Sequence, residues 1–576
     1  MNRAFKIILI ILGVSLVSAF ILSYITSRNA QAAQVETVQQ TVAETAAAPK
    51  VSYVSTGNAA KETFSYQTEY FDIVFNTEGA SVESLKLKSY TDGNGETVDG
   101  VFRGEGDNKA FLMYWGDDFT NPVLDAFSYN VSGQKVIFSN TYKAADGKTF
   151  TVVKTYEFRN SDYLFKVSVE INGEGVNNGD YAYTLAFEPQ VGPSFASMNN
   201  NNYEYRREYL GLYNNKGKVK RSMIKLSDNE FHTTRDSKWI SLTGKYFMVI
   251  AVPEDEAPVY KYSAVRSAGD VAQTDSLYIS VPEADASTEK GFYFYIGPQL
   301  KSFLGSYYSG TDNEWGLRNL NLDDAMESGS ILGWLESILK WCLKMIYKIV
   351  PNYGIAIIIL TILIKIATWP IQTKSMASSQ KISALTPMMN EIKEKYPNNQ
   401  QKQNAEIQKL YQEYGISPMS GCTPILLQFL QFPILIAFYG LLNRHFELRG
   451  AMFIPGWIND LSIPETVATL PFNLPLLGNQ IHVLPFLYVA TTVLTMLYTQ
   501  KSNSVDGVKQ PNMWFLTWGM PIMFLFILYA APSGLFVYWV TQGLLGALQQ
   551  FIMNMKKKNT PPLKLEKVVT SKKGRR

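Results

Sequence analysis

The 576-residue sequence predicts a membrane α-helical bundle joined to an all-β sandwich domain that lies outside the membrane. Three features predict this fold class. Long apolar runs occur near the N-terminus and repeatedly after residue 350, whereas residues 62–304 alternate apolar and polar positions in short runs. Lysine and arginine gather in the segments on one side of the apolar runs, which orients the chain across the membrane.

The N-terminal apolar run, at 7–25, follows Arg3 and Lys6 and is about long enough to cross a ~30 Å hydrocarbon core as a helix. We expect an uncleaved transmembrane anchor at 1–26. A cleavable signal peptide is the alternative, because residues 30–33 offer the small alanines that a cleavage site needs, although the run exceeds the usual apolar length of such a peptide. Either way, the residues that follow are exported. Residues 27–61, rich in Ala, Thr, Gln and Val, predict a flexible linker.

Residues 62–304 predict the β-sandwich. Runs such as Tyr-Leu-Phe-Lys-Val-Ser-Val-Glu-Ile at 163–171 alternate with period two, which is typical of strands that have one buried face. Many such strands, with little helical patterning over so long a stretch, favour two packed sheets.

Residues 328–350 predict a helix that lies along the outer membrane surface. Apolar residues fill most of its positions, while Glu336, Lys340, Lys344 and Lys348 recur every four residues as one narrow polar stripe. We expect the lysines to face lipid headgroups. The alternative is an ordinary amphipathic helix that packs on the soluble domain.

Further apolar runs bring the predicted number of transmembrane helices to six, of which the last five form the core. They lie at 353–371, 423–442, 483–499, 513–531 and 535–553. The segment 372–421 carries six lysines, and the tail 554–576 carries nine Lys or Arg against one Glu. The only Lys or Arg residues of the loop 443–482 are Arg444 and Arg449. The positive-inside rule therefore predicts that both termini are cytoplasmic and that the β domain is outside.

The segment 372–421 predicts a cytoplasmic helical hairpin. Both 373–396 and 400–414 favour helix, and Pro-Asn-Asn at 397–399 separates them with a turn. The alternative is a plain connector between two spans, but fifty residues is long for that.

Polar residues within the predicted spans are the strongest functional signal. Lys365 lies about two-thirds of the way through the span 353–371, where a buried ammonium costs at least ~2.5–3.5 kcal/mol. Thr361 and Thr368 share its helix face. Other spans carry similar stripes, which include Gln428, Gln431, Thr495, Tyr538 and Gln542. If these stripes face one another, they form a polar groove that opens to the cytoplasm.

Two alternatives to a groove follow from the same residues. Lys365 lies six residues before the end of its span, roughly 9 Å, so its ammonium could extend to the cytoplasmic headgroups. Thr and Gln in membrane helices also serve as packing contacts between helices. No carboxylate occurs in the last five spans, which disfavours a proton- or cation-coupled carrier.

Metal, cofactor and enzymatic chemistry find little support in the sequence. It contains three histidines without ligand-like spacing and neither a CxxC nor an HExxH motif. Cys342 and Cys422 fall on opposite sides of the membrane in the predicted topology, so we expect no disulfide between them. We expect no metal and no cofactor.

Short motifs at the ends of the spans resemble those of the YidC family of bacterial membrane protein insertases, and the resemblance covers nearly the whole chain. In the membrane part they are Thr-Ile-Leu-Ile-Lys at 361–365 with Trp-Pro at 369–370, Ser-Pro-Met-Ser-Gly-Cys-Thr-Pro at 417–424, Gln-Phe-Pro-Ile at 431–434, and Ala-Pro-Ser-Gly-Leu at 531–535 with Tyr538 and Trp539. In the outer domain they are Lys-Trp at 238–239, Lys-Tyr-Phe at 245–247, Tyr-Ile-Gly-Pro at 295–298, and Leu-Asp at 322–323.

The resemblance implies a periplasmic β-sandwich similar to sugar mutarotases and five core helices around a hydrophilic groove in the inner membrane. It implies an insertase and chaperone for nascent membrane proteins, which works alone or with the Sec translocon and can be a monomer. A positive groove residue, here Lys365, would receive the polar part of the incoming chain, whose apolar segment then enters lipid along 423–442 and 513–531. That residue is usually arginine in the family, so charge is kept here but bidentate capture is not. The family motif at 531–539 implies that Trp539 also borders the groove.

The basic tail would contact the ribosome or membrane lipid, since RNA phosphates and anionic lipid both attract such a segment. Its cations are Lys556, Lys557, Lys558, Lys572, Lys573, Arg575 and Arg576. Two other functions remain as alternatives at this stage: a transporter or channel that uses the same groove, and a sugar-binding or sugar-processing role for the β domain.

Overall fold

The computed structural model divides the chain into two compact units, which are Gln31–Ser328 and Met1–Ala30 with Gly329–Arg576. The structure describes residues 53–91, 95–101, 109–117, 119–176, 178–188, 207–213, 219–224, 231–234, 237–254, 261–268, 273–283, 289–326, 332–415, 433–442, 445–474, 477–503 and 514–558.

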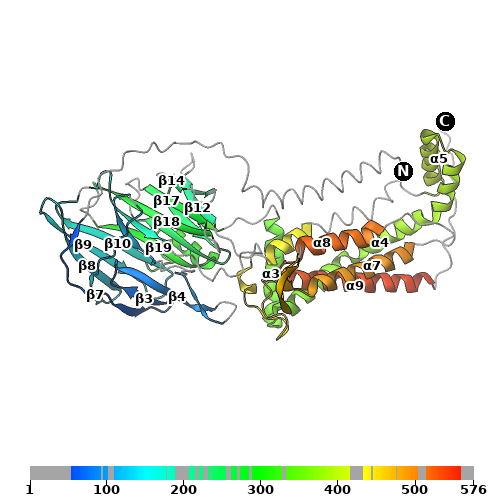
Figure 1. Cartoon of the computed structure of the whole chain (residues 1–576). Helices are drawn as coiled ribbons and strands as arrows, with labels where there is room; N and C mark the ends of the chain where they lie inside the picture. The colour runs from blue at the N-terminus through cyan, green and yellow to red at the C-terminus, as the bar shows by residue number, and fades with distance from the viewer. Residues whose placement is uncertain are drawn as a thin grey trace. The chain divides into compact units, whose positions relative to one another are not determined.

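Antiparallel sheets make up the first unit (Figure 1). The largest sheet runs in the order β1 (Val54–Ser55), β8 (Lys135–Lys143), β9 (Thr149–Glu157), β10 (Leu164–Gly173), β19 (Lys290–Pro298), β16 (Phe247–Pro253), β15 (Trp239–Thr243), β12 (Arg207–Tyr213) and β13 (Val219–Ile224), and β7 (Ser128–Ser132) also pairs with β8. A second sheet has the order β14 (Phe231–Thr234), β17 (Lys261–Ala268), β18 (Gln273–Pro282), β11 (Tyr181–Phe187) and β6 (Leu112–Trp115). A third consists of β2 (Thr63–Gln67), β3 (Phe71–Asn76), β4 (Ser81–Thr91) and β5 (Thr97–Asp99). The short helices α2 (Lys301–Leu304), η2 (Gly305–Tyr308) and η3 (Leu322–Ala325) follow.

Aromatic side chains hold the sheets of this unit together. Phe75 of β3 meets Tyr156 of β9 with ring centroids 5.0 Å apart. Phe111 similarly meets Phe294 of β19, at 4.8 Å. These inward residues come from strands that alternate buried and half-buried positions, as the period-two pattern requires. The β-rich character predicted for this domain is confirmed, and the alternating run at 163–171 forms most of β10, whereas the two-sheet sandwich and the bounds 62–304 stay predictions.

A buried lysine lies between two of these sheets. Lys154 of β9 is 1% exposed, and its Nζ donates hydrogen bonds to the carbonyl oxygens of Ala80, at 2.8 Å, and Phe111. Ala80 and Phe111 have φ of 48° and 64°, so both occupy the left-handed region that non-glycine residues rarely adopt. Burial lowers the pKa of Lys154 to about 7. The lysine thus ties two strained backbone positions to the large sheet.

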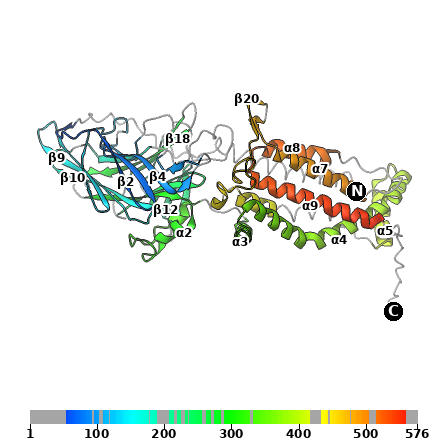
Figure 2. The ribbon, with the colours of Figure 1, turned by 90° about the horizontal axis from the view of Figure 1, so that it is seen from below.

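The second unit is helical and ends in a long C-terminal helix (Figure 1). Among its described residues, α4, α7, α8 and α9 lie side by side, as Figures 1 and 2 both show. Its elements are α3 (Gly333–Ile349), α4 (Tyr353–Lys395), α5 (Gln400–Glu413), the helix Pro433–Leu442, η5 (Phe446–Leu448), β20 (Ala468–Leu474), β21 (Gly478–Ile481), α7 (Leu484–Asn503), the π-helix η6 (Phe515–Gly519), α8 (Met520–Leu528) and α9 (Ser533–Lys558).

Within the described residues, only Tyr353–Thr373 is both long and apolar enough to span a membrane by length and composition. Pro433–Leu442 and Thr517–Leu528 are shorter apolar helices. The predicted anchor at 1–26 and the first ten residues of the predicted span 423–442 lie outside the described residues. The count of six transmembrane helices therefore stays a prediction.

Helix α4 joins two segments that the sequence suggested were separate. It begins at an Asn352 cap, whose Oδ1 accepts the Ile355 N–H at 3.0 Å, and continues to Lys395 with Pro370 and Pro387 inside it. The predicted span 353–371 and the first arm of the predicted hairpin are thus one helix. Helix α5 folds back on its end, where the Tyr411 hydroxyl lies 3.5 Å from Met389 Sδ.

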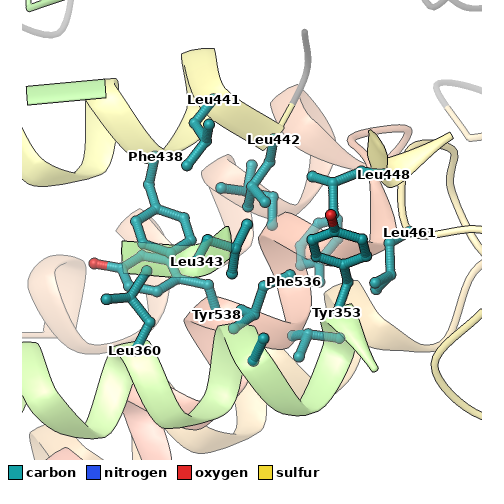
Figure 3. Close-up of a cluster of buried hydrophobic side chains, with 14 of the residues drawn as sticks. Leu343, Tyr353, Leu360, Phe438, Leu441, Leu442, Leu448, Leu461, Phe536 and Tyr538 are labelled. Atoms are coloured by element: carbon teal, nitrogen blue, oxygen red, sulfur yellow. The ribbon is translucent and has the colours of Figure 1, made fainter. Parts of the chain in front are cut away.

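An apolar cluster closes the end of the bundle at which α4 and α9 begin (Figure 3). Tyr538 of α9 stacks on Phe438 with ring centroids 4.4 Å apart, and Leu360 of α4 lies beside them. Leu343 brings α3 into the same cluster. These contacts fill this end of the helical unit with buried apolar side chains.

Helix α3 is held on the bundle by charge as well as apolar contact. Lys344 forms an ion pair with Glu447, and Glu447 also contacts Nδ1 of the buried His445. Burial opposes ionisation of Glu447, but His445 and Lys344 together hold the pKa of its carboxyl well below the usual range. Trp334 and Trp341, each 64% exposed, lie away from the buried Leu339 and Leu343.

Candidate functional site

Lys365 of α4 is the central residue of the candidate site. It is 7% exposed, so its side chain ends inside the helical unit. Among the described residues, its Nζ has neither a hydrogen bond nor an ion-pair partner. A buried ammonium without a partner is expensive, and such residues in membrane proteins commonly mark a wet or functional site.

Two glycines of α9 make room for this ammonium and for the neighbouring helix. A Cβ placed on Gly546 would lie 3.9 Å from Lys365 Nζ and 3.2 Å from Thr495 Cγ2. A Cβ on Gly543 would lie 2.6 Å from Thr491 Oγ1, which is too close. Thr495 Oγ1 also donates to the Gly543 carbonyl at 2.9 Å. The ammonium therefore lies where α4, α7 and α9 meet.

These glycines were not among the residues singled out from the sequence. Their signal was present, because small residues at three- and four-residue spacing let membrane helices approach closely. Gly543 and Gly546 are three apart on α9, and Thr491 and Thr495 are four apart on α7. Only the packed helices, however, bring the two pairs together.

The predicted threonines bond mainly to their own helices. Thr361 Oγ1, with the residue fully buried, donates to the Ile357 carbonyl at 2.6 Å. Thr368 Oγ1 donates to the Ile364 carbonyl at 2.9 Å. Such bonds satisfy the hydroxyl donors and leave oxygen lone pairs along the α4 face that carries Lys365.

Two glutamines of α9 contrast with the threonines. Gln542 Oε1 and Gln549 Nε2 are buried, and the described residues give neither atom a hydrogen-bond partner. Gln549 is 2% exposed as a whole. Buried polar atoms are normally paired, so unpaired atoms on the helix that borders Lys365 need a partner such as water or bound chain. Gln542 and Gln549 lie four residues before and three residues after Gly546, so they share the face of α9 that borders the ammonium.

The two aromatic residues of the candidate site lie on different sides of α9. Tyr538 belongs to the apolar cluster, against Phe438 (Figure 3). Trp539 packs on Tyr488 of α7, with ring centroids 5.0 Å apart, and on Phe536 at 5.5 Å. Neither is paired with Lys365 by a contact, and Tyr538 lies two α-helical turns before Gly546.

Several predicted residues fall where the structure gives no side-chain position. Gln428 and Gln431 lie outside the described residues, as do Lys572, Lys573, Arg575 and Arg576. Lys556, Lys557 and Lys558 form the last residues of α9, of which only the backbone is described. In the part of the chain that the structure describes, no group of three or more His, Cys, Asp or Glu could hold a metal ion.

Comparison with known proteins matches both units. Residues 64–342 match the family model of the YidC periplasmic domain, and residues 345–560 match that of the 60Kd inner membrane protein. The membrane protein insertase YidC of Treponema denticola is 35% identical over 512 residues, which cover 86% of this chain and 86% of that protein. The membrane protein insertase YidC of Treponema pallidum is 31% identical over 543 residues, with the same coverage of 86% for each chain.

One solved structure that matches is that of an active YidC insertase with the first transmembrane domain resolved. The match covers 89% of this chain and 95% of that chain, at 17% identity and a TM-score of 0.35. The family assignment rests on the sequence matches, which span the β-rich unit and the helical unit without a large gap. The chain combines a periplasmic β-rich domain with a helical membrane part, and it belongs to the YidC family of membrane protein insertases.

Proposed function

We propose that this chain inserts and folds integral membrane proteins by receiving the polar part of an incoming chain in a hydrophilic groove around Lys365. The buried ammonium of Lys365, which has no hydrogen-bond or ion-pair partner among the described residues, carries this proposal. The Gln542 and Gln549 atoms on the adjoining helix, which also lack partners in the part of the chain that the structure describes, support it, because a groove that holds water or substrate would supply their partners.

The groove would be bordered by residues of at least four predicted spans. On α4 these are Thr361, Lys365 and Thr368, on α7 Thr495, and on α9 Tyr538, Trp539 and Gln542. Gln428 and Gln431 would complete it from the span 423–442. The dense cluster around Phe438 and Tyr538 is consistent with closure toward the periplasm and opening toward the cytoplasm.

In this mechanism the groove lowers the cost of carrying a polar, often acidic, segment partway across the membrane. A substrate carboxylate about 4 Å from the ammonium would gain roughly 4 kcal/mol at an effective dielectric constant of 20. The apolar segment of the substrate then leaves into lipid along 423–442 and 513–531. No bond is made or broken, so the activity is not enzymatic.

The proposed topology has six spans with both termini in the cytoplasm of a bacterium and the β-rich domain in the periplasm. The basic residues at 556–558 and 572–576 would contact the ribosome or anionic lipid. Insertion would proceed alone or together with the Sec translocon. The relatives named membrane protein insertase support the class of substrate, namely membrane proteins.

The test is insertion of a synthetic single-span substrate with an acidic N-terminal segment into vesicles that contain only this protein. Replacing Lys365 with Glu turns attraction into repulsion, so we expect insertion to fall more than about tenfold, since 1.4 kcal/mol is a factor of ten. Lys365→Arg should retain most activity, and Lys365→Ala should fall between them. Full activity of Lys365→Glu would contradict the proposal.

Two controls distinguish insertion through the groove from a general effect of surface charge and from channel activity. Lys381→Glu makes the same charge reversal on an exposed position of α4 and should insert normally when ribosomes are absent. A small dye enclosed in the same vesicles should be retained during insertion. Release of the dye without insertion would favour a channel or transporter.

A further inference from the structure

The β20–β21 hairpin is an exposed apolar element outside the proposed groove. Its strands pair in an antiparallel register, with Ala468 opposite Ile481. Phe472 is 59% exposed, and Val467, just before the hairpin, is 55% exposed. Residues 466–481 contain no charged side chain and no histidine. Sixteen consecutive uncharged residues with exposed large apolar groups are unusual on a surface that faces only water.

The base of this hairpin is fixed to the helical unit by hydrogen bonds. The Tyr529 hydroxyl, at the end of α8, accepts from the His482 N–H at 3.0 Å and donates to the Gln480 carbonyl at 3.1 Å. The Ser533 N–H, at the start of α9, donates to the Ile463 carbonyl at 2.8 Å. The buried Glu465 carboxylate accepts the Leu484 N–H at the start of α7. The hairpin is therefore held at the ends of three helices.

The direction of the hairpin also matters. Figure 2 shows β20 projecting from one end of the helical unit, across the direction in which α7, α8 and α9 run. If these helices cross the bilayer as proposed, a crosswise hairpin at their outer ends lies along the membrane surface. Leu484, where α7 begins, follows β21 by only three residues, so the hairpin cannot lie far from that surface.

The composition of the hairpin favours lipid over a protein partner. Leu470, Phe472 and Leu474 alternate along β20 with Thr469, Pro471 and Asn473. This gives apolar groups for acyl chains on one side, and Thr469 and Asn473 as polar groups for the headgroup region on the other. Prolines at 471 and 475 lack N–H donors, which hinders the addition of a strand from another protein.

We infer that the β20–β21 hairpin rests in the outer leaflet of the membrane, with Phe472 among the lipid acyl chains at the headgroup boundary. The inference rests on the proposed topology. Its paired backbone suits this position, because a hairpin satisfies many of its own N–H and C=O groups. It would fix the depth of α7, α8 and α9 beside the groove.

The test uses the full chain with Cys342 and Cys422 replaced by serine and one new cysteine that carries the fluorophore NBD. The protein is reconstituted in vesicles of phosphatidylethanolamine and phosphatidylglycerol, with or without bromine on the acyl chains. NBD at Phe472→Cys should lose fluorescence in brominated vesicles and resist quenching by aqueous iodide. Val467→Cys, also exposed at the hairpin, provides a second probe if the first variant fails to fold.

Two further positions distinguish failure of the inference from failure of the topology. Leu494→Cys lies on α7 at 41% exposure and should be quenched by brominated lipid if α7 spans the membrane. Ser132→Cys is exposed on β7 of the β-rich unit and should respond only to iodide. Quenching by lipid at Leu494 but not at Phe472 or Val467 would overturn the hairpin inference alone. Absence of lipid quenching at Leu494 as well would overturn the topology and the inference with it.

Discussion

Replacing Lys365 by methionine should stabilise the helical unit while it weakens insertion. Methionine keeps an unbranched, flexible side chain of similar reach but removes the charge. The packing around Gly546 and Thr495 would therefore change little, whereas the buried charge would be lost. Stability and activity should move in opposite directions, as at many sites that hold an unfavourable group for function.

The size of the stabilisation follows from the burial of Lys365. A lysine in the middle of a membrane helix costs about 2.5–3.5 kcal/mol on insertion scales. Lys365 is 7% exposed and has no hydrogen-bond or ion-pair partner among the described residues, so little of that cost is offset by the protein itself. Water in the groove offsets a part of it. We expect Lys365→Met to stabilise the unit by about 1–3 kcal/mol.

Thermal unfolding of the purified protein in detergent, followed by loss of the monodisperse peak on gel filtration, measures this effect. The midpoint for Lys365→Met should rise by several degrees relative to the original protein. Lys381→Met, at an exposed position of the same helix, should leave it unchanged. A lower midpoint for Lys365→Met would mean that the ammonium is stabilised inside the protein, which would refute the reasoning that makes it a substrate-facing group.

Three further outcomes follow from the structure. Gly543→Ala should destabilise the helical unit by about 1–3 kcal/mol in the same unfolding assay, because the new Cβ would lie 2.6 Å from Thr491 Oγ1. Gly546→Ala should destabilise it less, because the nearest contact of its Cβ is 3.2 Å. Burial lowers the pKa of Lys154 to about 7, below its value in the unfolded chain, so the unfolded chain binds more protons between about pH 7 and 10. The stability of the β-rich unit should therefore rise with pH over this range. Denaturant unfolding of the full chain should show this slope, and Lys154→Met should lack it. Glu447→Gln should weaken the attachment of α3, seen as faster hydrogen exchange between Gly333 and Ile349, and unchanged exchange there would show that apolar contacts alone hold the helix.

Features that depend on one buried face were predictable from the sequence. The alternation at 163–171 led to β10, because burial of one side of a strand leaves a period of two in the sequence. Lys365 stood out because a charged side chain within an apolar membrane span is costly and usually has a functional role. Lys154 of β9 was not singled out from the sequence, and its carbonyl partners come from segments far away in the chain.

Features that depend on tertiary contacts were not predictable. Helix α4 continues past Pro370 and joins the predicted span to the predicted hairpin arm, although proline removes a helical hydrogen bond and usually marks a break. The close approach of Gly543 to Thr491 needs two helices in one particular register. The β20–β21 hairpin lies within what the sequence suggested was only a loop between spans, because its strands are short and β20 contains Pro471.

Photocrosslinking from the groove to a substrate tests the central claim most directly. A photoreactive residue in place of Gln542, on the helix that borders Lys365, is compared with one in place of Leu544, which is 52% exposed on the same helix. The substrate is a stalled membrane protein with an acidic N-terminal segment. The proposed mechanism predicts crosslinks from position 542 to that acidic segment, and their loss when Lys365 is replaced by glutamate. Crosslinks to the acidic segment from position 544 but not from 542, or crosslinks from 542 that Lys365→Glu leaves unchanged, would contradict it.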